Sequence, residues 1–187
     1  FPWFSPGEPP LWWSPHPRGV LRPEQVHVSR SLRRQLRKGG FQLTWNRAFG
    51  PVMQACGDLR PEGTWITMSM TRAYRALHRA GFAHSLEVWH DGELSGGIYG
   101  VQVGALFAAE SMFHRRTGAS KIALAAFART LARAGVRLID VQFLTPHLGS
   151  MGAVEISRDE YLGEVASLRD VEVDLSGLEP SWQTPCS

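Results

Sequence analysis

The sequence predicts a mixed α/β (α+β) fold, in which one sheet is flanked by helices, from three patterns. Residues 83–101 alternate around Asp91-Gly92, a strong two-residue hairpin signal. Residues 120–134 carry an apolar stripe at helical spacing. Residues 136–143 form a nearly continuous apolar strand, which is typical of a strand buried on both faces. We expect this last strand to run parallel to a neighbour, because a helix precedes it.

The remaining elements follow from capping and punctuation signals along the chain. Ser29 or Ser31 caps a helix that Gly39-Gly40 stops, and Ser157 with Glu160 predicts a capping box for a last helix. The other expected elements are a strand at 41–45, helices at 48–58 and 67–81, and a strand at 103–109. Helices, an antiparallel meander, a long helix and a buried strand follow one another in this order in an acetyltransferase-like (GNAT-type) sheet.

Composition bounds the class of protein. The chain has 187 residues with 43% apolar and 20% charged content, which predicts one main domain with a real core. No apolar run approaches the roughly 18 residues of a spanning helix, so we expect no membrane association. Cys56 and Cys186 lie far apart and form no framework. A reducing cytoplasm is the simplest compartment, and Cys56 is interpreted as a core residue.

The N-terminal segment has a different character. Its first 23 residues hold seven of the twelve prolines and three of the seven tryptophans. Proline lacks an N–H donor, so we expect neither a regular helix nor a central strand here. We therefore place a predicted domain boundary after residue 24, with a main domain at residues 25–187.

Charge is distributed unevenly along the chain. Residues 18–38 hold seven basic side chains against one acid, and residues 155–187 hold eight acids against two arginines. A basic segment of this size can steer a polyanion, and the alternative is a solvated helix face.

Two polar residues interrupt the apolar strand at 136–143. Asp140 and Gln142 are spaced i, i+2, so both are expected on one face of the sheet. Burying them is costly unless they are paired or functional. One interpretation is an internal hydrogen-bonded pair that anchors a loop. The other is a carboxylate that orients an amide toward a reacting group.

Glu110 and several tryptophans are further candidates. Glu110 is expected where the strand at 103–109 ends, the kind of place where ligands bind, or else it is a surface acid that begins a turn. Trp3, Trp12, Trp13 and Trp65 lie in loop-like contexts, where rings stack on bases or simply pack. No metal-type spacing of His or Cys, no P-loop and no GxSxG motif occurs, so no metal or cofactor is expected.

Several longer strings, taken together, resemble the bacterial leucyl/phenylalanyl-tRNA–protein transferase family. They run in order from residue 1 to about residue 161. The strings are Phe1-Pro2-Trp3-Phe4-Ser5-Pro6-Gly7, Trp12-Trp13-Ser14-Pro15 with Pro17-Arg18, Glu62-Gly63-Thr64-Trp65-Ile66-Thr67, His84-Ser85-Leu86-Glu87-Val88-Trp89, Gly96-Gly97-Ile98-Tyr99-Gly100, Glu110-Ser111-Met112-Phe113, Ala119-Ser120-Lys121, and Leu138-Ile139-Asp140 with Gln142.

The resemblance implies an acetyltransferase-like core that uses aminoacyl-tRNA and needs no cofactor. The implied reaction transfers Leu or Phe, and Met less well, to the α-amino group of proteins that begin with Arg or Lys, and so marks them for degradation. The implied partners are the aminoacyl-tRNA and those proteins, and a monomer is expected. Residues 1–24 would be the Pro/Trp-rich remnant of a small N-terminal domain, because the family carries a further segment before the Phe1-Pro2-Trp3-Phe4 motif. Residues 25–187 would be the catalytic domain.

The resemblance also implies roles for individual residues. Asp140 would polarise the Gln142 amide, which contacts the attacking amine, and Glu110 would contact the bound substrates. Trp3 and Trp65 would flank the terminal adenosine. The amino-acid side chain would enter a pocket of Ile98, Phe107, Met112, Leu124, Phe127 and Ile139. Phosphates of the acceptor stem would be bound by Arg30, Arg33, Arg34, Arg37 and Lys38.

One local departure and two rival functions accompany the resemblance. Thr145-Pro146 stands where the family often has Asn-Asp, so the contacts of that loop are open. The rivals are an acetyl-CoA-dependent N-acetyltransferase of the same fold and a non-catalytic RNA-binding module. We find no pyrophosphate loop before the long helix, which counts against the first. The polar residues within a buried strand count against the second.

Overall fold

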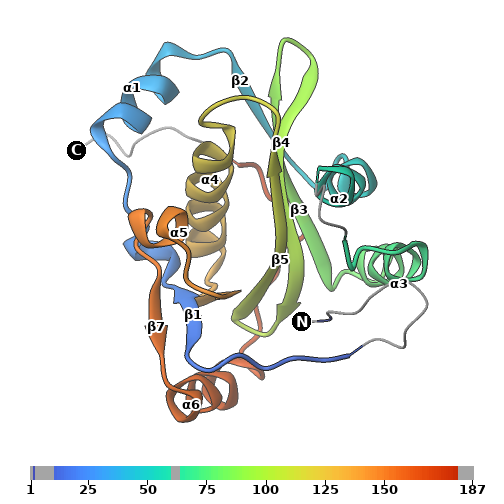
Figure 1. The fold of residues 1–187 in the computed structure, drawn as a ribbon, viewed down its shortest axis with the longest axis vertical. Coiled ribbons are helices and arrows are strands. Elements are labelled where there is room, and N and C mark those ends of the chain that lie inside the picture. The colour runs from blue at the N-terminus through green and yellow to red at the C-terminus, as the bar shows by residue number, and fades with distance from the viewer. Residues whose placement is uncertain (1, 3–10, 60–63, 181–187) are drawn as a thin grey trace.

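The computed structural model describes residue 2, residues 11–59 and residues 64–180 (Figure 1). Its strands form one mixed sheet in the order β2-β3-β4-β5-β6-β1-β7. The strands are β1 (Arg18–Leu21), β2 (Phe41–Trp45), β3 (Ala83–His90), β4 (Glu93–Val103), β5 (Leu106–His114), β6 (Leu138–Gln142) and β7 (Val154–Ile156). The helices are η1 (Pro23–Gln25), α1 (Arg30–Lys38), α2 (Phe49–Asp58), α3 (Met68–Arg79), α4 (Ala119–Ala134), α5 (Pro146–Ser150) and α6 (Arg158–Leu168).

The centre of the sheet confirms the predicted meander and crossover. Strands β2 to β5 pair antiparallel in succession, and α4 then leads to β6, which pairs parallel to β5. Gly135 ends α4 in the left-handed conformation, with a φ of 100°. The mixed α/β sheet flanked by helices is therefore the fold of the chain.

Helices cover both faces of the sheet. In Figure 1, α4 lies against one face, while α2 and α3 lie on the other side of β3 and β4. A continuous run of α4 from Ile122 to Ala128 is fully buried, and this run joins a core cluster with strand residues such as Leu86 and Ile139. A second cluster lies under α2 and α3 and contains Cys56, as expected for a core cysteine. No helix in the described part of the chain is long and apolar enough to cross a membrane.

The predicted serine caps are confirmed, with Ser29 rather than Ser31 as the cap of α1. Ser29 caps α1 by accepting a hydrogen bond from the Leu32 N–H, and Thr67 caps α3 in the same way. Ser157 and Glu160 form the predicted capping box at the start of α6.

The expectation that the first 23 residues exclude a central strand is wrong. Strand β1 lies inside the sheet, where it pairs antiparallel with both β6 and β7. Pro17 and Pro23 stand just outside the four-residue strand, so they remove no N–H that the ladder needs. The strand falls in the 1–24 segment, and it belongs to the same sheet as the rest of the chain.

The strand expected at 103–109 is placed too early. β5 begins at Leu106 and continues to His114, with a bulge in its pairing opposite Tyr99 and Gly100. Glu110 therefore lies in the middle of β5 and not at its end. The alternation that marks a strand is broken at such a bulge, because one strand carries an extra residue there.

Candidate active site

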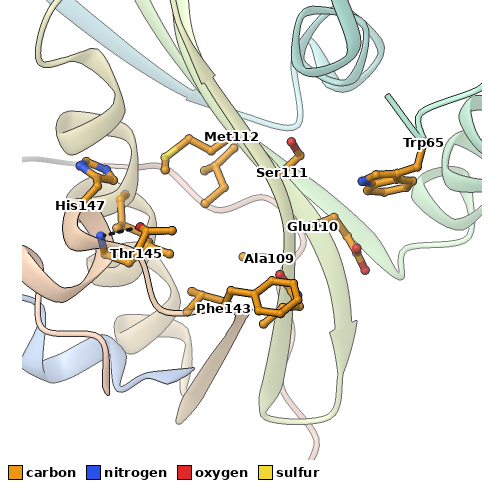
Figure 2. A pocket seen from close by; sticks show the side chains of 13 residues that line it. Trp65, Ala109, Glu110, Ser111, Met112, Phe143, Thr145 and His147 are labelled. Carbon is orange, nitrogen blue, oxygen red and sulfur yellow. Dashed lines mark hydrogen bonds between the residues drawn. The ribbon is translucent and has the colours of Figure 1, made fainter. Parts of the chain in front are cut away.

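The candidate site lies where β5 and β6 stop pairing. Their parallel ladder ends at Ala108 opposite Asp140, although β5 continues for six more residues. A cavity of about 350 Å³ opens beyond this last pair. Figure 2 shows it between β5 and the segment after β6. Glu110 and Gln142 are each two residues past the last pair, so both reach the same gap.

The cavity has mostly apolar walls with polar residues at intervals. Thirteen residues from five parts of the chain line it. They are Trp65, Ile98, Ala109, Glu110, Ser111, Met112, Leu124, Val141, Gln142, Phe143, Thr145, His147 and Leu148. A cavity of this volume and composition is typical of a site for a small organic group.

The predicted apolar pocket is divided between the wall of this cavity and the core behind it. Ile98, Met112 and Leu124 line the cavity. The other three predicted residues, Phe107, Phe127 and Ile139, are completely buried in the core cluster that supports these residues. The rings of Phe107 and Phe127 meet edge to face at 4.9 Å, which fixes that support.

The tryptophans fall into different environments. Trp65 is 4% exposed, packs against Tyr74 and lines one end of the cavity, near Glu110 (Figure 2). Trp12 and Trp13 are exposed. Trp3 lies outside the described residues. Of the two residues expected to flank an adenosine, only Trp65 can therefore be placed, and it lies at the cavity.

Glu110 lines the cavity, and its pKa is strongly raised. Burial raises its pKa to about 7, and the negative charge of Asp140 adds to this effect, whereas Tyr74 and Arg18 oppose it. Its Oε2 atom is shielded from solvent and has no hydrogen-bond partner among the described residues. A carboxyl group that is partly ionised at neutral pH and has such an oxygen can accept a hydrogen bond from a ligand.

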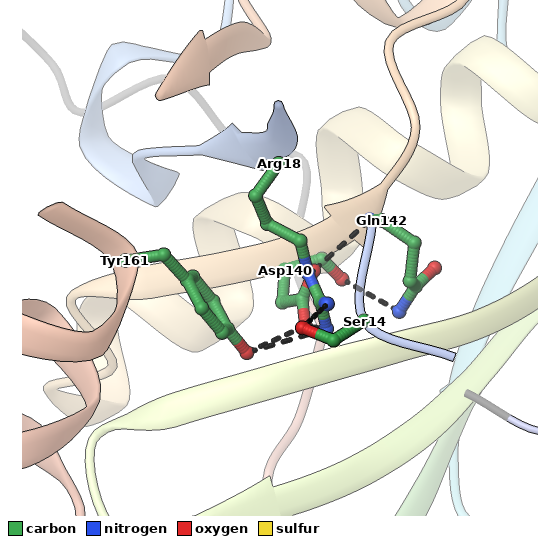
Figure 3. A network of polar contacts seen from close by, with 5 residues as sticks. All are labelled: Ser14, Arg18, Asp140, Gln142 and Tyr161. Carbon is green, nitrogen blue, oxygen red and sulfur yellow. Dashed lines mark hydrogen bonds and ion pairs between the residues drawn. The ribbon is translucent and has the colours of Figure 1, made fainter. Parts of the chain in front are cut away.

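Asp140 is the centre of a polar cluster beside the cavity (Figure 3). Its Oδ1 accepts hydrogen bonds from Arg18 Nε at 2.9 Å and from the Gln142 main-chain N–H at 3.0 Å. Its Oδ2 accepts from Arg18 Nη2 at 2.6 Å and from the Tyr161 hydroxyl at 2.8 Å. Four hydrogen bonds fill the acceptor sites of one carboxylate.

The two partners of Asp140 respond to its charge. Burial by itself lowers the pKa of the Arg18 guanidinium, but the hydrogen bonds and charge of Asp140 outweigh this effect and raise it. Burial, followed by the neighbouring Asp140 carboxylate, raises the pKa of the Tyr161 hydroxyl. Arg18 therefore stays charged and Tyr161 stays neutral, so both remain donors to the carboxylate.

The contact between Asp140 and Gln142 differs from the expected one. The carboxylate binds the main-chain N–H of Gln142, and the Gln142 side chain donates from Nε2 to the Asp140 main-chain carbonyl at 3.3 Å. The reason is the positive φ of 62° at Gln142, which turns the chain after Asp140. Gln142 Oε1 takes part in none of the hydrogen bonds found among the described residues, and Gln142 lines the cavity.

No sequence pattern pointed to His147, which lies at the end of the cavity away from Trp65 (Figure 2). Burial lowers the pKa of His147, and the nearby Lys121 and His114 add to this effect, so the ring is neutral at pH 7. Its Nε2 atom is shielded from solvent and has no hydrogen-bond partner among the described residues.

Thr145, whose loop contacts the sequence left open, caps α5. Its side-chain oxygen accepts a hydrogen bond from the Leu148 N–H.

Arg18 and Tyr161 were not singled out as site residues either. They lie 122 and 21 residues from Asp140 in sequence, and no local pattern links them to it. Arg18 had counted only as part of the basic segment, although Pro17-Arg18 belongs to a string that carries the resemblance.

The basic residues of α1 form an exposed surface. Leu32 alone is buried in this helix, and Gln35 Nε2 donates to the Thr117 carbonyl just before α4. The exposed members are Arg30, Arg33, Arg34, Arg37 and Lys38. This surface, called the α1 basic surface below, contains no acid.

The described residues thus offer an apolar cavity with a hydrogen-bond acceptor, a neutral imidazole and a carboxyl of raised pKa at its edge. No group of three or more His, Cys, Asp or Glu residues that could hold a metal ion occurs among them. Such a site can bind an acyl group with an apolar side chain and orient a nucleophile beside it. These features are the ones that acyl transfer requires of an active site.

Comparison with known proteins identifies the kind of acyl transfer. Residues 20–166 match the family model described as leucyl/phenylalanyl-tRNA protein transferase. The chain is 54% identical over 169 residues to the leucyl/phenylalanyl-tRNA–protein transferase of Klebsiella pneumoniae subsp. pneumoniae, covering 90% of this chain and 72% of that one. The protein of the same name from Salmonella typhimurium also shows 54% identity with the same coverage. The chain therefore belongs to the leucyl/phenylalanyl-tRNA–protein transferase family of aminoacyltransferases.

Solved structures give a looser likeness. A GCN5-related N-acetyltransferase from Kribbella flavida superposes with a TM-score of 0.49 at 11% identity, covering 75% of this chain and 55% of that one. The assignment to the family depends on the sequence matches and not on this likeness.

Proposed function

We propose that the chain transfers Leu or Phe, and Met less well, from aminoacyl-tRNA to the α-amino group of proteins that begin with Arg or Lys. The product is a protein marked for N-degron (N-end rule) degradation. Its partners are the aminoacyl-tRNA and the acceptor protein, and it acts in the cytoplasm as a monomer. The observation that carries the proposal is the gap between β5 and β6, where Glu110 and Gln142 border an apolar cavity.

The cavity walls suit an aminoacyl group that carries an apolar side chain. Ile98, Met112 and Leu124 would contact the donor's Leu or Phe side chain. Trp65, at the end near Glu110, would stack on the terminal adenosine of the tRNA. A hydrophobic pocket discriminates by roughly 1–3 kcal/mol per methylene, which favours Leu over Val and disfavours Met only weakly.

The reaction needs little beyond positioning, because the aminoacyl ester is already activated. The acceptor's amine nitrogen attacks the ester carbonyl carbon, a C–N bond forms, and the C–O bond to the ribose breaks. One proton of the amine ends on the released ribose hydroxyl, so atoms and charges balance. Gln142 Oε1 would accept a hydrogen bond from the amine, and Glu110 would hold the bound substrates nearby.

A transfer assay tests the proposal. Radiolabelled Leu-tRNA is incubated with the chain and with acceptor proteins that differ only in a first residue of Arg, Lys or Ser. We expect labelled acceptors for Arg and Lys only, and less product with Met-tRNA than with Leu-tRNA. Equal labelling of all three acceptors contradicts the basic acceptor. No labelling of any acceptor, with acetyl transfer from labelled acetyl-CoA instead, favours the acetyltransferase.

The cavity wall predicts donor selectivity. Leu124→Phe adds volume to the wall, so transfer of Phe should fall about tenfold more than transfer of Leu. The measurement is kcat/KM for each donor. Leu131→Phe is the matched control, because Leu131 is equally buried on the same helix but does not line the cavity. An unchanged donor ratio in Leu124→Phe would place the amino-acid side chain elsewhere.

The α1 basic surface predicts a salt dependence of tRNA binding. Replacing Arg33, Arg34 and Arg37 by alanine should reduce the slope of log affinity against log salt by about one for each phosphate that the helix no longer neutralises. Arg137→Ala is the control. Arg137 is exposed and follows the C-terminal end of α4, whereas α1 contacts the chain just before the N-terminal end of that helix. The slopes are obtained from the affinity for tRNA measured between about 50 and about 300 mM salt. Equal slopes for the triple variant and wild type would remove α1 from the tRNA interface.

A further inference from the structure

The chain makes a strained turn at the edge of the cavity. The φ of 62° at Gln142 is unusual for a residue with a side chain. The Phe143 N–H donates to the Val141 carbonyl at 2.7 Å, two residues back. This pattern with a positive φ is the rarer, strained form of the γ-turn, which persists only where surrounding contacts hold it.

Two sets of contacts hold the turn in place. Asp140 binds the Gln142 main-chain N–H through its carboxylate and the Gln142 side chain through its carbonyl. On the other side, the β1 backbone presses against the turn at Gly19. A Cβ atom on Gly19 would lie 2.7 Å from the Phe143 carbonyl carbon and 2.9 Å from the Leu144 nitrogen, so only glycine fits there.

The Asp140 carboxylate is itself fixed by residues from two distant elements. Arg18 of β1 grips it with a two-pronged contact, and Tyr161 of α6 donates its hydroxyl (Figure 3). The guanidinium carbon of Arg18 also lies 4.4 Å from the centre of the Tyr161 ring. Asp140 is 1% exposed, and its four hydrogen bonds leave no free acceptor site for a substrate.

We propose that Arg18 and Tyr161 are positioning residues for the transfer reaction. Their hydrogen bonds fix the orientation of the Asp140 carboxylate. The carboxylate in turn stabilises the turn that places Gln142 at the cavity. Asp140 then acts through the main chain of Gln142 and does not polarise its side-chain amide. This inference rests on the proposed function, because the reaction gives Gln142 its task.

Tyr161→Phe is the sharpest variant. It keeps the ring beneath Arg18 and removes only the hydroxyl that donates to Asp140. We expect kcat for transfer to fall about tenfold while KM for Leu-tRNA stays within about twofold. The reason is that a misplaced Gln142 stabilises the transition state less well but leaves binding of the substrate in the ground state almost unchanged. Arg18→Lys should lower kcat further, since an ammonium cannot make the two-pronged contact.

A second readout does not depend on activity. The main-chain amide proton of Gln142 is hydrogen-bonded to the Asp140 carboxylate. Its hydrogen exchange should therefore become about tenfold faster in Tyr161→Phe. Glu164→Gln is the matched control. It breaks the 2.5 Å ion pair with Arg22, which also connects the β1 region to α6 but does not touch Asp140. Both its kcat and its Gln142 exchange should match wild type.

The outcomes separate the two proposals. A wild-type chain without transfer activity overturns the proposed function, and exchange at Gln142 still decides whether the turn is held as proposed. Normal transfer in Tyr161→Phe overturns the positioning role, whether or not exchange becomes faster. An equal loss of kcat in Glu164→Gln also overturns it, because general loosening of α6 would then explain the effect.

Discussion

Replacing Asp140 by asparagine is expected to lower the free energy of unfolding by about 3 kcal/mol or more. The change keeps the shape of the side chain but removes the charge that pairs with Arg18, whose side chain is 8% exposed. An amide group has one acceptor oxygen, whereas four donors converge on the carboxylate. At least one donor is therefore left unpaired or faces another donor. Urea unfolding of the variant and wild type measures the difference.

The surface pair of Arg169 and Asp170 provides a matched control. It joins the same two residue types at 3.3 Å, but its side chains are 61% and 84% exposed. Asp170→Asn should change the free energy of unfolding by less than about 0.5 kcal/mol, because solvent screens an exposed pair. Equal stabilities for Asp140→Asn and wild type would show that the buried cluster does not hold the fold.

The same variant is also expected to lose transfer activity by about a hundredfold. Without the carboxylate the Gln142 turn relaxes, and a shift of about 1 Å in an acting group can cost this much. The double variant Arg18→Gln with Asp140→Asn should regain part of the stability, because no charge is left unpaired, but none of the activity. Activity that returns together with stability would indicate a purely structural role for the cluster.

Replacing Glu110 by glutamine should stabilise the chain in a pH-dependent way. Burial raises the pKa of this carboxyl to about 7 from an ordinary value of 4.5. Between these two values the folded state holds a proton that the unfolded state has released, so the wild-type stability falls as pH rises through this window. Glutamine carries no charge at any pH. The variant should match wild type near pH 4 and exceed it by about 2 kcal/mol at pH 8, a value reduced for partial exposure.

Unfolding in urea at pH 4, 6 and 8 measures this difference. Glu93→Gln is the control, because Glu93 is an exposed acid on β4, the strand next to Glu110. A difference between Glu110→Gln and wild type that stays constant with pH would contradict a raised pKa. In the transfer assay the loss of activity in Glu110→Gln should be largest at pH 8, where the wild-type carboxylate is ionised and accepts a hydrogen bond from a bound substrate most strongly.

Much of the fold could be predicted from local signals. The hairpin at Asp91-Gly92, the Ser29 cap and the Ser157 capping box were all predicted from neighbouring residues. Each of these signals involves residues within one turn of helix or one tight hairpin, so it can be recognised from the sequence without the tertiary structure. β1 was missed because four residues between prolines carry too little pattern, and their partners in β6 and β7 lie more than a hundred residues away.

The candidate site divides in the same way. The sequence alone determined the mixed fold, the family resemblance, and the choice of Glu110, Asp140 and Gln142 as the polar residues to watch. Only the tertiary structure decided that Asp140 is saturated by Arg18, Tyr161 and the Gln142 main chain, and that Glu110 and Gln142 line one cavity. The physical reason is that acceptor saturation and strand separation depend on contacts between residues far apart in the chain, which no local spacing records.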